Sequence, residues 1–131
     1  MYRRTTHSIE VTVTPTYLED RSIPSDERYV WAYEARIHNH GDKTVQLRAR
    51  HWRITDAFGR VEEVHGPGVV GEEPVLRPGE FFKYTSTSGF LPTPSGIMVG
   101  TYDMETENGE RFAVDIPAFS LDSPYQERRL H

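Results

Sequence analysis

Three glycines, Gly66, Gly68 and Gly71, have the spacing Gly-x-Gly-x-x-Gly, which lets backbone amides approach a pyrophosphate in dinucleotide-binding folds. In those folds a helix follows the motif, whereas here two glutamates and a proline follow it. The two carboxylates beside the loop would also repel phosphate. We therefore interpret the loop as a tight turn. Binding of a phosphorylated small molecule through residues 66–71 remains an alternative, because a nest of amides can hold an anion without a helix.

Two histidines, His38 and His40, lie two positions apart in a segment with the pattern of a strand. Residues with that spacing share one face of a strand, so both imidazoles could hold the same metal ion. A third ligand must come from elsewhere, and His51, His65 and several carboxylates are available but cannot be placed from the sequence. We interpret the pair as solvated histidines at a strand edge, and we predict neither a metal site nor a cofactor.

The residue types of a nucleophilic triad are present as Ser86, Ser88 and Ser95 together with His51 and Asp56. A hydrolase with a nucleophile elbow would carry Gly-x-Ser-x-Gly, and the sequence has no such motif. Fold and residue types alone do not define an activity. We therefore assign no catalytic residue and predict that the chain is not an enzyme.

A basic stretch, Arg48, Arg50 and Arg53, is flanked by His51 and Trp52. Arginine and aromatic side chains on one surface can stack the bases of single-stranded nucleic acid. The chain, however, carries a net charge of −5, which disfavours general attraction to phosphate backbones. We expect Arg48 and Arg50 to share a strand face and to pair there with glutamates, and we predict no nucleic-acid partner.

Two adjacent valines, Val69 and Val70, lie inside the glycine loop, where polar residues are usual. If their side chains are exposed, they form a small apolar surface of the kind that binds other proteins. The alternative is that they fold back onto the core. We keep both interpretations and name the pair as a candidate interaction surface.

The composition limits the remaining classes of function. The 131 residues fit one domain, which we place at residues 1–121, followed by a polar C-terminal tail at residues 122–131. There is no cysteine, which excludes disulfides and thiol chemistry. No apolar segment follows the basic residues 1–4, and none approaches the roughly 20 apolar residues of a membrane span. We expect a cytoplasmic protein without a membrane partner.

The elements that must position these residues are strands, because the dominant hydrophobic period is two. Turn signals separate them, among them Asn108–Gly109, and no segment has a helical pattern. The expected strands are residues 9–14, 28–40, 44–56, 61–65, 81–88, 97–107 and 111–116, with a half-strand at 118–121. Seven to eight short strands predict an all-β antiparallel sandwich of the immunoglobulin or fibronectin type III kind. Trp31 and Trp52 are the expected core anchors. The shift in alternation within residues 44–56 predicts either that both faces of this strand are partly covered or that a bulge lies near Arg50.

Several stretches of the chain resemble the ApaG family. They are Ile9–Val13, Tyr29–Tyr33, Val45–Trp52, Ile54–Asp56, Gly66–Glu72, Pro78–Glu80, Thr93–Gly96 and Ile116–Leu121. The resemblance extends from about Tyr2 to Leu121 and implies a fibronectin type III-like sandwich. The family is named for a gene neighbourhood with diadenosine tetraphosphate hydrolysis and is linked to cobalt and magnesium tolerance. Related eukaryotic domains resemble interaction modules, and the resemblance supplies no catalytic residues.

The residues and the resemblance together predict a non-enzymatic binding or regulatory module whose partner is another protein. The alternatives are a binder of pyrophosphate or a nucleotide at residues 66–71 and a role in cobalt or magnesium homeostasis. Edge strands without protecting charges can also pair with each other, so a homodimer is a further expectation.

Overall fold

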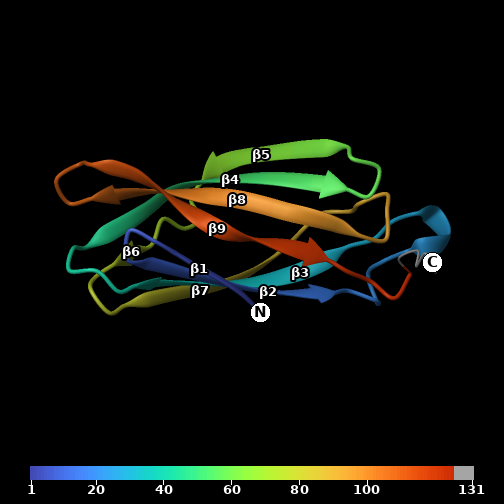
Figure 1. Ribbon diagram of the computed structural model, residues 1–131, viewed down its shortest axis with the longest axis horizontal. Coiled ribbons are helices and arrows are strands. Elements are labelled where there is room, and N and C mark those ends of the chain that lie inside the picture. The colour runs from blue at the N-terminus through green and yellow to red at the C-terminus, as the bar shows by residue number, and fades with distance from the viewer. Residues whose placement is uncertain (126–131) are drawn as a thin grey trace, which may run out of the picture.

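The computed structural model describes residues 1–125, which form a sandwich of two antiparallel sheets (Figure 1). One sheet has the order β1-β2-β3-β7, and the other has the order β5-β4-β8-β9 with the short β6 beside β4. The strands of the first sheet are β1 (Tyr2–Thr6), β2 (Ile9–Tyr17), β3 (Trp31–Asn39) and β7 (Phe81–Thr87). Those of the second are β4 (Val45–Asp56), β5 (Val61–Pro67), β6 (Val75–Leu76), β8 (Gly96–Thr106) and β9 (Arg111–Leu121). The predicted all-β sandwich is confirmed, and the helical content of the described chain is one 3-10 turn, Pro24–Asp26.

Two strands were not predicted from the pattern. β1 has the sequence Tyr-Arg-Arg-Thr-Thr, which carries no apolar alternation, and it becomes a strand by pairing with β2 over the whole of its length. β6 is two residues long and pairs with β4 at Val45 and Gln46. In both cases tertiary pairing determines the strand, so local propensity carries little signal.

The first predicted strand does not end at Pro15, because β2 continues to Tyr17. β1 pairs with β2 only as far as Val13, and among residues 1–125 no strand pairs with β2 beyond that point on the β1 side. Backbone groups along an antiparallel strand point alternately to its two neighbours, and the nitrogen of Pro15 points to the β1 side. A missing N–H there costs no hydrogen bond to another strand. Proline is therefore tolerated in a strand that is otherwise internal.

The core lies between the two sheets and includes both tryptophans. Trp31 is 1% exposed and Trp52 is 3% exposed, which confirms their predicted place. The Trp52 ring meets the rings of Tyr33 and Phe119 at centroid distances of 5.3 and 5.8 Å. Edge-to-face contacts of this kind add to the free energy gained by burying the rings.

The end of the described chain packs against the sandwich. The indole Nε1 of Trp31 donates to the carbonyl oxygen of Asp122 at 2.8 Å, and the Tyr125 hydroxyl donates to Glu19 at 2.8 Å. The polar tail expected at residues 122–131 is thus described as far as Tyr125, and residues 126–131 lie outside the described part. Within residues 1–125, no helix has the length and apolar character needed to cross a membrane.

Candidate functional site

The glycine loop that follows β5 closes on itself as a tight turn. Val69 and Glu72 exchange two backbone hydrogen bonds of 2.8 Å each. The two residues between them have positive φ, 44° at Val70 and 79° at Gly71, which is the geometry of a type I′ turn. Gly71 is therefore explained by the backbone conformation that this turn requires.

The other two glycines of the motif allow close packing. A Cβ at Gly68 would lie 2.2 Å from the carbonyl oxygen of Glu72, and one at Gly66 would lie 2.8 Å from Nη1 of Arg50. The amide of Gly68 donates to the Arg48 carbonyl at 2.8 Å. The N–H groups of Gly68, Val69 and Glu72 therefore already donate hydrogen bonds to carbonyl oxygens of this chain. Phosphate binding at residues 66–71 stays an untested prediction.

Gly68→Ala is expected to destabilise the protein by about 2–3 kcal/mol, because the new methyl group meets backbone at a position with φ of 58°. Chemical unfolding measures this change. The matched control is Gly109→Ala, which also has positive φ but has open space around the added Cβ, so its loss should be smaller. If both variants lose the same stability, close packing at Gly68 is not important.

The structure separates the two valines of the candidate interaction surface. Val69 is fully buried and belongs to the core cluster, so for this residue the interpretation that it folds back onto the core is the one that holds. Val70 is 53% exposed at the tip of the turn. A two-residue turn reverses the chain at Val70 and directs the flanking Val69 inward. Only Val70 remains available as part of a surface, and its binding to a partner stays a prediction.

The three arginines of β4 do not form a common basic face. A bulge between Leu47 and Ala49 shifts the register, near the predicted place, and reverses the alternation of the side chains. Arg48 pairs with Glu105 at 3.2 Å and with Glu73 at 3.5 Å, which confirms the predicted ion pairing for this residue.

Arg50 lies on the side of the strand that carries the buried Trp52 and Ile54. Its Nη1 donates to the carbonyl oxygens of Pro67 and Gly68 at 3.0 and 3.1 Å. The expectation that Arg48 and Arg50 share a face is therefore wrong, because the bulge lies between the inward-facing Leu47 and Arg50.

Two of the residues considered for a nucleophilic triad, Ser88 and Asp56, have other hydrogen-bond partners in the structure. Ser88 Oγ accepts from the Trp31 amide at 3.1 Å and donates to the Gly89 carbonyl at 2.7 Å. Asp56 Oδ1 accepts from the amides of Phe58 and Arg60 in the turn after β4. Both side chains thus complete backbone hydrogen bonds, as serine and aspartate commonly do in turns and at strand ends.

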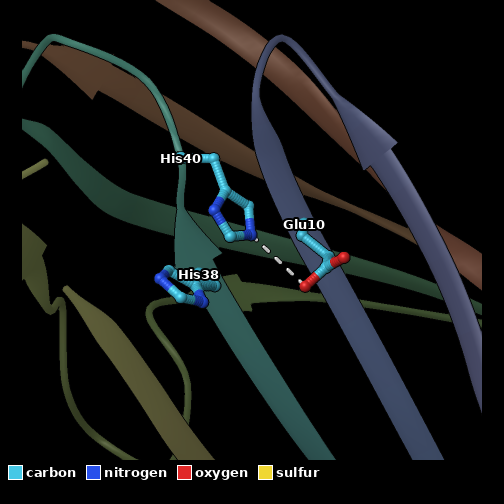
Figure 2. Close-up of side chains that lie close together, drawn as sticks. All are labelled: Glu10, His38 and His40. Atoms are coloured by element: carbon cyan, nitrogen blue, oxygen red, sulfur yellow. Dashed lines mark hydrogen bonds and ion pairs between the residues drawn. The ribbon is translucent and has the colours of Figure 1, made fainter. Parts of the chain in front are cut away.

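The pairing of β2 with β3 brings a carboxylate to the two histidines that were predicted to share a face. Glu10 lies opposite His38 in the register, and His40 follows the end of β3. Figure 2 shows the His40 ring directed at the Glu10 carboxylate, with Nε2 and Oε1 3.4 Å apart. The rings of His38 and His40 are 4.0 Å apart. Sequence reasoning could not find Glu10, because its proximity follows from the register of two strands distant in the chain.

A second histidine pair lies on the other sheet. His51 and His65 are opposite each other in β4 and β5, and their rings stack at 3.9 Å with an interplanar angle of 12°. Glu63 lies beside them, with its Oε1 3.9 Å from Nε2 of His51. The described residues thus contain two groups of two histidines and a glutamate whose donor atoms could converge on an ion.

One known protein family matches most of the sandwich. The sequence profile of the ApaG domain matches residues 19–106, which is more than half of the chain. The chain belongs to the ApaG family. The resemblance inferred from the residues is thereby confirmed.

Curated ApaG proteins match along the whole chain. The ApaG of Paramagnetospirillum magneticum is 64% identical over 131 residues, and that of Parvibaculum lavamentivorans is 63% identical over 131 residues, with each chain fully covered. These alignments include residues 122–131, which the inferred resemblance left out. The names of these ApaG relatives specify no reaction.

A solved structure has the same fold. The crystal structure of a Bordetella pertussis protein designated ApaA is 47% identical, with a TM-score of 0.86, and the match covers 96% of this chain and all of that one. The two chains therefore share one fold over almost their whole length.

A buried tyrosine pair inside the ApaG sandwich was not found from the sequence. The hydroxyls of Tyr84 on β7 and Tyr102 on β8 are 2.6 Å apart, and the two residues are 6% and 0% exposed. Burial raises the pKa of both phenols, and it also raises the pKa of the nearby Tyr33. These neutral hydroxyls link the two sheets through a polar contact in the core.

Proposed function

We propose that this ApaG chain is a non-enzymatic binding module that recruits a protein partner by adding an extended segment of the partner to the edge of β7. The observation that supports this proposal is the position of β7, which has β3 as its one strand neighbour in the described sheet. An edge strand presents unpaired N–H and C=O groups to any extended peptide that approaches it.

The hydrogen bonds at both ends of β7 define which groups face outward. The Asn39 amide donates to the Glu80 carbonyl, and the Ser88 amide donates to the Trp31 carbonyl, so even-numbered residues bond to β3. By the alternation of an antiparallel ladder, the backbone groups of Phe81, Lys83 and Thr85 face the open edge. Side chains at these positions are exposed, and Phe81 is 53% exposed.

The other edges are better protected than β7. β5 carries Glu62, Glu63 and, at its end, Pro67, which are residues that discourage strand addition. On β9, the amides of Asp115 and Ser120 donate to side chains of β1, namely Thr6 Oγ1 at 3.2 Å and the Tyr2 hydroxyl at 3.3 Å. β1 itself exposes Arg3 and Arg4. β7 contains one charged residue, Lys83, and no proline.

A groove beside the open edge could receive an apolar side chain of the partner. It has a volume of about 380 Å³ and lies between residues 74–76 and residues 79–82. Val75, which is 54% exposed, and Phe81 belong to its lining. The edge would supply affinity through main-chain hydrogen bonds, and the groove would supply specificity for the side chains.

Thr85→Pro is expected to weaken strand addition by about tenfold or more, because it removes an outward amide and leaves the bonds to β3 intact. The probe is a displayed library of short peptides selected on the intact protein. Selected peptides should protect the amides of Phe81, Lys83 and Thr85 from hydrogen exchange.

The matched control is Glu63→Pro, which changes an outward amide on the β5 edge and should leave peptide binding unchanged. Melting temperatures verify that both variants are folded. Peptides that protect other segments, or that bind Thr85→Pro as tightly as the parent, would contradict the proposal. Light scattering detects a homodimer, and a dimer that Thr85→Pro converts to monomers would show that the partner is a second copy.

A further inference from the structure

Side chains of the types that bind metals converge on the outer face of the first sheet, where His38 lies opposite Phe81 of β7 with the two ring centroids 6.1 Å apart. Donor atoms of Glu10, His38 and His40 all lie within 4.8 Å of one another (Figure 2). Glu10 comes from β2, His38 comes from β3, and His40 lies directly after β3. The β2–β3 ladder runs over nine residue pairs and holds the first two opposite each other. We propose that these three residues form a binding site for a divalent transition-metal ion of the Zn²⁺ and Ni²⁺ class.

The distance between two of the donors fits a shared ion better than a direct ion pair. Nε2 of His40 and Oε1 of Glu10 are 3.4 Å apart. A charge-assisted hydrogen bond between such groups is usually about 2.7–2.9 Å long. Two ligands that are each about 2.0–2.1 Å from one tetrahedral ion lie roughly 3.4 Å apart. The two side chains therefore already have the spacing that a common ion requires.

Neighbouring groups orient the remaining donors. Nε2 of His38 is 3.2 Å from the carbonyl oxygen of Gly79, to which it can donate, leaving Nδ1 with a free lone pair. An imidazole that binds a metal commonly donates its other nitrogen to a backbone carbonyl in this way. The second oxygen of Glu10, Oε2, is 3.6 Å from Nε of Arg3, which leaves Oε1 for the ion.

The chemistry of the donor set selects the class of ion. Two imidazoles and one carboxylate suit Zn²⁺, Ni²⁺, Co²⁺ and Cu²⁺, whereas Mg²⁺ prefers an all-oxygen shell. Three protein ligands leave a coordination position for water or for a donor from another molecule. His40 is 47% exposed on its side chain, so an ion can reach the site from solvent.

Zn²⁺ titration of the full chain by calorimetry tests the site, and Mg²⁺ serves as the ion that should not bind. Glu10→Gln and His40→Asn are each expected to weaken Zn²⁺ binding by about tenfold or more. The matched control is His7→Asn, which removes an exposed histidine from the β1–β2 turn at a position with φ of 49°, where asparagine is well tolerated. This control should bind Zn²⁺ as the parent does.

Paramagnetic Ni²⁺ locates the ion independently of the variants. Amide signals of residues 9–11 and 37–41 should broaden first when Ni²⁺ is added. The proposal is overturned if Zn²⁺ gives no heat, or if Glu10→Gln and His40→Asn bind as tightly as the parent. It is also overturned if binding is lost only in His65→Asn and the broadened signals come from β4 and β5, because the ion then occupies the other histidine pair.

Discussion

Replacing Trp31 by alanine is expected to lower the free energy of unfolding by about 3–5 kcal/mol. The Trp31 ring is 1% exposed and meets the Tyr17 ring edge-on at 5.4 Å. Its Nε1 also donates the hydrogen bond to the Asp122 carbonyl. The substitution leaves a cavity in the core and removes the donor to the Asp122 carbonyl, and both changes favour unfolding. Urea unfolding followed by circular dichroism measures the loss.

Two further variants separate the contributions to the loss at Trp31. Trp31→Phe keeps an aromatic ring but removes the hydrogen bond, so its loss of unfolding free energy should be smaller than that of Trp31→Ala but greater than zero. Phe58→Ala truncates a ring that is 73% exposed in the turn after β4, and it should change stability by no more than about 0.5 kcal/mol. A Trp31→Ala protein that is as stable as the Phe58→Ala protein would contradict the role of Trp31 in the core.

The strand pattern was sufficient to predict the sandwich because a period of two assigns each side chain to a face. In β3, for example, Tyr33, Ala35 and Ile37 alternate with polar residues and are all buried. The same alternation correctly placed Trp31. Such predictions need no knowledge of which strands are neighbours, because burial of one face is already encoded in a single strand.

Features that depend on pairing were harder to predict. β1 has no apolar alternation, and its strand conformation follows from the ladder with β2. The bulge of β4 was one of two interpretations of the sequence pattern, and its position before Ala49, which decides the face of Arg50, depends on the register with β8. Val69 is buried because the adjacent two-residue turn directs it inward, and the loop composition alone does not reveal that direction.

Only part of the candidate metal site could be predicted, because one of its three residues depends on strand pairing. The shared face of His38 and His40 follows from their spacing in one strand. Glu10 is their neighbour only because the β2–β3 register places it opposite His38. Predicting the hydroxyl contact of Tyr84 and Tyr102 would also require the packing of one sheet on the other, since these residues belong to different sheets. The amount of chemistry that a sequence reveals thus decreases as more strands contribute to a site.

The second large effect is expected at alkaline pH. Burial raises the pKa of Tyr84 and Tyr102 above the ordinary value, so the folded protein retains two protons that the unfolded chain releases near pH 10. Their contribution to stability is therefore fully present below about pH 10 and is lost as the pH rises towards the folded pKa values. At about pH 11 the expected loss is roughly 1.4 kcal/mol for each phenol.

The double variant Tyr84→Phe/Tyr102→Phe tests this assignment, because it removes both phenols and keeps both rings. Its stability should fall less than that of the parent when urea unfolding is compared at about pH 9 and pH 11. Tyr102→Phe alone leaves the Tyr84 hydroxyl without its partner, so at neutral pH it should cost about 1–3 kcal/mol, more than the double variant does. Tyr125→Phe removes a phenol that is 46% exposed, and most of the alkaline loss should remain. If the double variant and the parent lose equal stability above pH 10, other groups cause the alkaline transition, and the buried pair remains only a packing contact between the sheets.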